Sequence, residues 1–175
     1  MRCIIKIGNR LKFRAAQQHL DVVNIMKKMK ILVLCTGNSC RSQLAEGYLR
    51  HYAGEHAEVY SAGIETHGVN PKAIKVMAED GIDISKHTSN NIDEYTSIPF
   101  DYVITVCDNA KENCPYFPSK AVKFHQNFPD PAKASGTEEE IFNEFKRVRE
   151  MIKSFSSDFV QKNILTNISK AGSLK

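Results

Sequence analysis

Short apolar runs alternate with longer amphipathic segments from residue 30 onward. The first run, Lys30–Leu34, ends at Cys35 and is rich in branched residues, which is typical of a buried parallel strand. Similar short runs predict strands at Glu58–Ser61, Phe100–Val106 and Ala121–Phe124. The Phe100–Val106 run leads directly into Cys107, so two of the predicted strands end at a cysteine.

Helical spacing of apolar residues fills the intervals between these runs. Ser42–Ala53 has this spacing, and Asn70-Pro71 predicts the start of a second helix, with Asn as the N-cap and Pro at the first helical position. The clearest helix lies near the C-terminus, where apolar residues recur every three or four positions at Ile141, Phe145, Val148, Ile152, Phe155 and Phe159.

This strand–helix alternation predicts an α/β fold, a doubly wound four-stranded parallel sheet with helices on both faces. Ligands of such sheets bind beyond the carboxyl ends of the strands. Cys35 and Cys107 each follow a strand, and Asp130 follows the last strand shortly afterwards. We therefore expect these three side chains at one edge of the sheet.

The chain divides into three parts by composition. Residues 1–29 hold seven Lys and Arg against one acid and have no clean periodicity, so we expect a non-native extension or a disordered segment, with Met29 as the true first residue. A transit peptide and an additional helix are the alternatives. Residues 30–160 form the predicted domain, and residues 161–175 a polar tail.

Charge and composition exclude several function classes. The formal net charge is +4, but without residues 1–29 the chain has 17 bases against 19 acids, so a broad basic surface for nucleic acid is not expected. No apolar run reaches the roughly 18 residues of a membrane helix, and no secretory signal is recognisable, which predicts a cytoplasmic protein. In that compartment the five cysteines favour catalysis or metal binding over structural disulfides.

The segment from Cys35 to Ser42 is the strongest candidate site. Between Cys35 and Arg41 lie Thr36, Gly37, Asn38, Ser39 and Cys40, and a loop of this length before a helix can surround a tetrahedral oxyanion with backbone N–H groups. Arg41 adds a planar pair of donors. The same donors and a Ser42 hydroxyl are expected to lower the pKa of Cys35 and make it a nucleophile.

Other interpretations of this loop are weaker. A buried cysteine at a strand end leaves the Gly, Arg and Ser spacing unexplained, and zinc binding lacks a second thiol pair with the required spacing. The nucleotide-binding phosphate loop is excluded because Gly-Lys-Ser/Thr is missing. Cys40 is expected to point away from the anion and to be structural.

Cys-x5-Arg-Ser after an N-terminal strand resembles the signature of the low-molecular-weight tyrosine phosphatases and of the thioredoxin-coupled arsenate reductases, over about residues 30–155. Those reductases carry two further cysteines where this chain has Cys107 and Cys114. The resemblance implies a relay in which Cys35 attacks arsenate, Cys107 attacks Cys35, and Cys114 then attacks Cys107, giving a disulfide that thioredoxin reduces.

Asp130, in Phe128-Pro-Asp-Pro131, is the candidate general acid, although a turn aspartate before proline is the structural alternative. Ala132 follows in place of the aromatic residue usual in the phosphatases. Asn38, Glu46 and Ser61 match positions that bind potassium in some relatives. Asn90 stands where those relatives have an aspartate ligand, so we assign no metal.

The sequence thus predicts a cytoplasmic, monomeric arsenate reductase with no bound cofactor, which receives its electrons from thioredoxin. Phosphate and sulfate are expected to compete with arsenate. A low-molecular-weight protein tyrosine phosphatase is one alternative, and a non-catalytic oxyanion or redox sensor is another.

Overall fold

The computed structural model describes residues 28–107 and 120–168, and its centre is a parallel four-stranded sheet. The strands are β1 (Met29–Cys35), β2 (Ala57–Gly63), β3 (Tyr102–Thr105) and β4 (Val122–His125), in the order β2-β1-β3-β4. β1 therefore lies between β2 and β3, and Cys35 at its end is paired with Gly63.

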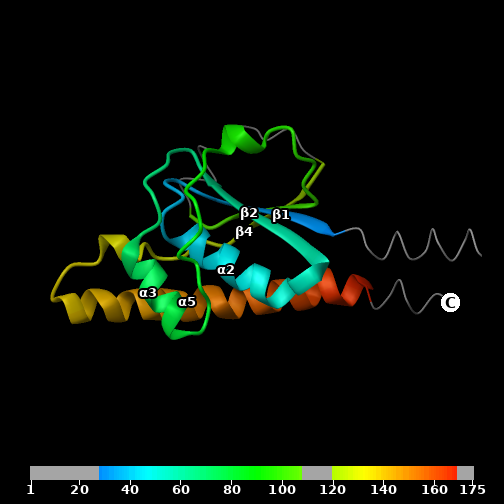
Figure 1. Cartoon of the computed structure of the whole chain (residues 1–175). Helices are drawn as coiled ribbons and strands as arrows, with labels where there is room; N and C mark the ends of the chain where they lie inside the picture. Colours follow the sequence, from blue (N-terminus) through cyan, green and yellow to red (C-terminus); the bar gives the residue numbers. More distant parts are fainter. Residues whose placement is uncertain (1–27, 108–119, 169–175) are drawn as a thin grey trace, which may run out of the picture.

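Three α-helices pack against one face of the sheet, below it in Figure 1: α2 (Arg41–Ala53), α3 (Pro71–Glu79) and α5 (Glu138–Val160). The other face is covered by the 3-10 helix η2 (Ile92–Tyr95) and the segment that follows it. Two short 3-10 helices, η1 (Gly54–His56) and η3 (Pro131–Lys133), complete the described elements before the end of α5. The predicted fold is confirmed.

Alternation along β1 explains how the sheet fills two cores. Ile31 and Val33 face the α-helices, whereas Leu32 and Leu34 face the η2 side, and all four are buried. A strand buried on both faces needs such a continuous apolar run. β1 is therefore the buried centre of the domain, and the loop that leaves it is attached to a well-packed strand.

The helix ends follow from local side chains. Asn70 accepts a hydrogen bond from Lys72 N at 2.8 Å with Pro71 at the first helical position, so the predicted start of α3 is confirmed. Thr137 and Glu140 form a capping box at the start of α5.

The C-terminal helix runs further than the sequence predicted. A π-helical turn, η4 (Gln161–Leu165), continues α5, and residues 166–168 are again α-helical. Ile164 is fully buried, and the Tyr102 hydroxyl donates to the Asn163 carbonyl at 3.2 Å. The helix thus continues past residue 161, where a polar tail was expected, because Ile164 and the half-buried Leu165 and Ile168 pack against the core. Residues 1–27, including most of the predicted extension, and residues 108–119, including Cys114, lie outside the described residues.

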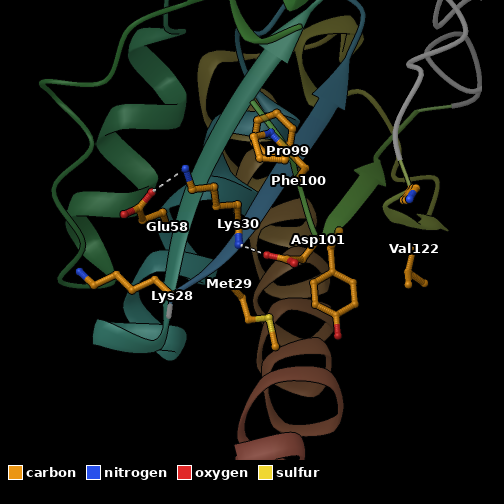
Figure 2. A pocket seen from close by; sticks show the side chains of 10 residues that line it. Lys28, Met29, Lys30, Glu58, Pro99, Phe100, Asp101 and Val122 are labelled. Atoms are coloured by element: carbon orange, nitrogen blue, oxygen red, sulfur yellow. Dashed lines mark hydrogen bonds and ion pairs between the residues drawn. The ribbon is translucent and has the colours of Figure 1, made fainter. Parts of the chain in front are cut away.

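A hollow of about 890 Å³ lies at the amino ends of the strands (Figure 2). Residues from all four strands line this hollow. Lys30 contacts two acidic residues there: its backbone N–H donates to Asp101 at 2.8 Å, and its ammonium group lies 3.8 Å from Glu58. Because Cys35 is at the opposite end of β1, this hollow is separate from the candidate site. No helix within residues 28–107 and 120–168 is both long and apolar enough to cross a membrane.

Candidate active site

The loop after β1 is held from outside by the chain that follows β2. The carbonyl oxygens of Thr36, Gly37 and Ser39 accept hydrogen bonds from the backbone N–H groups of Glu65, His67 and Asn70 at 2.9, 3.1 and 2.9 Å. In a trans peptide unit the N–H points away from its C=O. The N–H groups of the next residues therefore face the inside of the loop, as an oxyanion cradle requires.

Two glycines allow this close packing. A Cβ on Gly63 would lie 2.6 Å from the Thr36 carbonyl oxygen and 2.8 Å from the Asn38 nitrogen, so the loop passes directly over Gly63. A Cβ on Gly37 would lie 2.6 Å from the imidazole of His67. A side chain at Gly63 would displace the loop, whereas one at Gly37 would displace the exposed imidazole of His67.

The sulfur of Cys35 lies at the base of the loop. Asn38 donates its backbone N–H to this sulfur at 3.1 Å, and Ser42 Oγ lies 2.9 Å from it. Because Ser42 Oγ already accepts from the Asn38 side-chain amide at 3.0 Å, its own proton is free to point at the sulfur. Two donors thus converge on Cys35.

The pKa of Cys35 differs from the expectation. The pKa of this thiol is raised above its usual value, and burial is the largest cause. The Ser42 hydroxyl lowers the pKa, and the nearby Cys107 thiol raises it. The backbone N–H groups of Asn38 and Ser42 lower it by smaller amounts. The sequence-based prediction of a lowered pKa omitted desolvation, because a motif does not show that Cys35 is only 4% exposed. Thiolate formation therefore depends on donors that offset burial.

Arg41 and Asp130 meet at the mouth of the loop. Arg41 Nη2 lies 2.9 Å from Asp130 Oδ2, and Nη1 donates to the Phe128 carbonyl at 3.1 Å. Asp130 Oδ1 also accepts from Ala132 N at 3.2 Å and caps η3. The catalytic and structural interpretations of Asp130 are therefore compatible, because the turn fixes its carboxyl group beside the Arg41 guanidinium.

A second thiol reaches the same loop from the neighbouring strand. Cys107, two residues beyond β3, is 3% exposed, and its sulfur lies 3.5 Å from the Thr36 hydroxyl. Cys35, Cys40 and Cys107 are all free thiols. Cys40 packs in the core, where burial raises its pKa, in line with the expected structural role.

Comparison with known proteins places this geometry in a family. The family model of the low molecular weight phosphotyrosine protein phosphatases matches residues 30–170. The chain belongs to this phosphatase family.

Within the phosphatase family, the chain is similar to arsenate reductases. One from Halalkalibacterium halodurans is 54% identical over 127 residues, which is 73% of this chain and 91% of that relative. One from Bacillus subtilis is 48% identical over 136 residues, or 78% of this chain and 98% of that relative. A solved structure described as an arsenate reductase in the phosphate binding state has a TM-score of 0.67 at 32% identity and covers 77% of this chain and 98% of its own.

The positions that bind potassium in some members of the phosphatase family are arranged here as a hydrogen-bonded chain. The Asn38 amide group donates to Ser61 Oγ at 2.8 Å, Ser61 donates to Glu46 at 2.5 Å, and the other Glu46 oxygen lies 2.7 Å from Arg50. Asn38 thus presents its NH2 group, not its oxygen. The oxygens of Glu46, Ser61 and Asn38 are thus engaged in hydrogen bonds and an ion pair with Arg50, and we derive no step through a cation.

Sequence reasoning missed one residue of this phosphatase-family site. Gln43 is fully buried, and its amide group donates to the Asn38 carbonyl, in the loop after β1, and to the Thr88 carbonyl. His87 Nδ1 lies 3.0 Å from Gln43 Oε1. The available signal was a glutamine between Ser42 and the apolar Leu44, at a helix position that faces the core.

Proposed function

We propose that this chain reduces arsenate to arsenite and is regenerated by thioredoxin. The observation that carries the proposal is the second buried thiol, Cys107, beside an oxyanion loop that already contains Cys35. Hydrolysis of a phosphate ester needs one thiolate and an acid. Reduction needs two electrons, which a pair of thiols supplies when it becomes a disulfide. The similarity to arsenate reductases supports the same conclusion.

The first proposed step joins Cys35 to arsenic. The Cys35 thiolate attacks arsenate in the loop, an S–As bond forms, and one arsenate oxygen leaves as water. Arg41 and the inward N–H groups bind the oxyanion, and Asp130, held beside Arg41 at 2.9 Å, supplies a proton to the leaving oxygen. Arsenic is still pentavalent after this step.

The second proposed step is the reduction. The Cys107 thiolate attacks the Cys35 sulfur, an S–S bond forms, and the electron pair of the S–As bond stays on arsenic, which leaves as trivalent arsenite. The Thr36 hydroxyl, 3.5 Å from Cys107, is placed to donate a hydrogen bond to that attacking sulfur.

The third proposed step regenerates Cys35. Cys114 attacks Cys107 and releases Cys35 as a thiolate, and the dithiol of thioredoxin then reduces the Cys107–Cys114 disulfide by exchange. Cys107 must bond to two sulfurs in turn, each with a Cα separation below about 7 Å, so its side chain must move between them. That the protein acts as a cytoplasmic monomer stays a prediction.

An assay of two activities in parallel tests this proposal. Consumption of NADPH is measured with arsenate, thioredoxin and thioredoxin reductase, and hydrolysis of an aryl phosphate is measured with the same preparation. We expect arsenate-dependent turnover that is lost in Cys107→Ser, with aryl phosphate hydrolysis retained at a low rate. Rapid aryl phosphate hydrolysis without arsenate turnover would favour the phosphatase alternative, which the Arg41–Asp130 pair and the loop also fit.

A further inference from the structure

Asn38 is the residue that directs donors at Cys35, and its backbone conformation is unusual. Its φ is +42°, the only positive φ among the described non-glycine residues, and its side chain is fully buried. Its backbone N–H donates to the Cys35 sulfur, and its side-chain amide donates to Ser42 Oγ. A non-glycine residue keeps a left-handed conformation only where its surroundings fix it.

Gln43 supplies part of those surroundings from the first turn of α2, together with Asn90, whose backbone N–H donates to Asn38 Oδ1 at 2.7 Å. Gln43 Nε2 lies 3.0 Å from the Asn38 carbonyl oxygen, 3.2 Å from Asn38 Oδ1 and 2.9 Å from the Thr88 carbonyl oxygen. Three acceptors around one NH2 group fix the orientation of the amide. Gln43 Oε1 must then accept from His87 Nδ1, at 3.0 Å, which assigns the His87 proton to Nδ1.

We propose that Gln43 is a positioning residue for the nucleophile, because it helps to hold Asn38 in the left-handed conformation. In that conformation the Asn38 backbone N–H points at the Cys35 sulfur. The Asn38 side-chain amide donates to Ser42 Oγ and so turns the Ser42 hydroxyl proton toward the same sulfur. Gln43 does not contact the sulfur itself. The inference rests on the proposed function, in which Cys35 is the nucleophile, and it adds Gln43 as a residue that acts on Cys35 through Asn38.

The loop and its donors are held by different contacts. The carbonyl groups of Thr36, Gly37 and Ser39 are fixed by the backbone of residues 65–70, independently of Gln43. Arg41 is fixed by Asp130 and Phe128. Loss of the Gln43 amide therefore leaves most of the oxyanion cradle in place but removes the hydrogen bond that holds the Asn38 carbonyl group, whereas Asn90 and Ser61 still hold the Asn38 side chain. The reactivity of Cys35 and the affinity for an oxyanion should separate.

The experiment compares Gln43→Met, which keeps the length of the side chain and removes its hydrogen bonds, with the wild-type protein and Tyr48→Phe. Tyr48 is also buried on α2, and its hydroxyl bonds only to Asp80 among the described contacts, so this variant controls for a general loss of stability. Two quantities are measured without arsenate at pH 7: the rate of Cys35 alkylation by iodoacetamide, followed by peptide mass mapping, and the Kd of inorganic phosphate.

For Gln43→Met we expect the alkylation of Cys35 to be about tenfold slower, because about one charge-assisted hydrogen bond to the thiolate is lost. The Kd of phosphate should stay within about threefold of the wild-type value. Tyr48→Phe should alter neither quantity by more than about twofold. A folded Gln43→Met with wild-type alkylation overturns the proposal, and so does an equal loss of alkylation and phosphate affinity, which indicates general packing. If Gln43→Met does not fold, the same criteria apply to Gln43→Glu. Because arsenate is absent, failure of arsenate turnover leaves this result interpretable.

Discussion

Ser42 is the side chain whose removal tests the proposed activation of Cys35 most simply. Ser42→Ala deletes a hydroxyl that lies 2.9 Å from the Cys35 sulfur and is fully buried, so water cannot replace it. A hydrogen bond to a charged group contributes about 1.5–3 kcal/mol. If the bond acts on the thiolate, alkylation of Cys35 at pH 7 should slow by roughly 10- to 150-fold, since about 1.4 kcal/mol is a factor of ten.

The assay is iodoacetamide alkylation with mass mapping of Cys35, accompanied by arsenate turnover with thioredoxin. Ser156→Ala is the matched control: Ser156 Oγ is also buried and has no hydrogen-bond partner among the described residues, so this variant should react like wild type. An alkylation rate within twofold of wild type in folded Ser42→Ala would refute the reasoning, because Ser42 would then not stabilise the thiolate.

Three further changes test other parts of the account. Gly63→Ala places a Cβ 2.3 Å from the Glu65 carbonyl oxygen, so we expect a loss of about 2 kcal/mol or more in urea unfolding and much weaker phosphate binding; wild-type values for both would exclude this packing. Arg41→Lys removes the two-donor guanidinium and should lower the phosphate affinity measured by calorimetry at least tenfold. The control variant Lys72→Arg should change this affinity little. Asp80→Asn should lower the urea midpoint at pH 7, and the difference from wild type should disappear in acid.

The sign of the Asp80 effect follows from its contacts. Burial raises the pKa of Asp80, but the hydrogen bonds from Lys153 and Tyr48 outweigh burial and lower it overall. The unfolded chain therefore takes up the proton first as the pH falls. The stabilisation is complete above the unfolded pKa of about 3.9 and is lost as the pH falls through the lower folded value. A difference between variants that persists unchanged below that range would contradict this assignment.

The sequence allowed the frame of the site to be predicted because its signals are local. Cys35 ends an apolar run, Arg41 and Ser42 follow at fixed spacing, and Asp130 lies between two prolines. Strand–helix alternation was enough to bring Cys35 and Cys107 to one sheet edge. Each of these features depends on a few neighbouring residues or on a general rule of parallel sheets.

The residues that hold the loop could not be predicted because their partners are distant. Gln43 acquires its role from Thr88 and His87, which lie more than 40 positions further along the chain. The raised pKa of Cys35 depends on burial by the whole domain, which a ten-residue motif does not show. Likewise, the extension of α5 past residue 160 depends on a core that receives Ile164.

The central claim is that Cys35 and Cys107 act in one reductive relay, and a single trapping measurement tests it. Cys114→Ser is mixed with one equivalent of arsenate, and the products are analysed by peptide mass mapping and arsenite quantification. The proposed relay predicts one equivalent of arsenite and a Cys35–Cys107 disulfide that accumulates because the next thiol is absent. Arsenite release with no disulfide between Cys35 and Cys107 would contradict the relay.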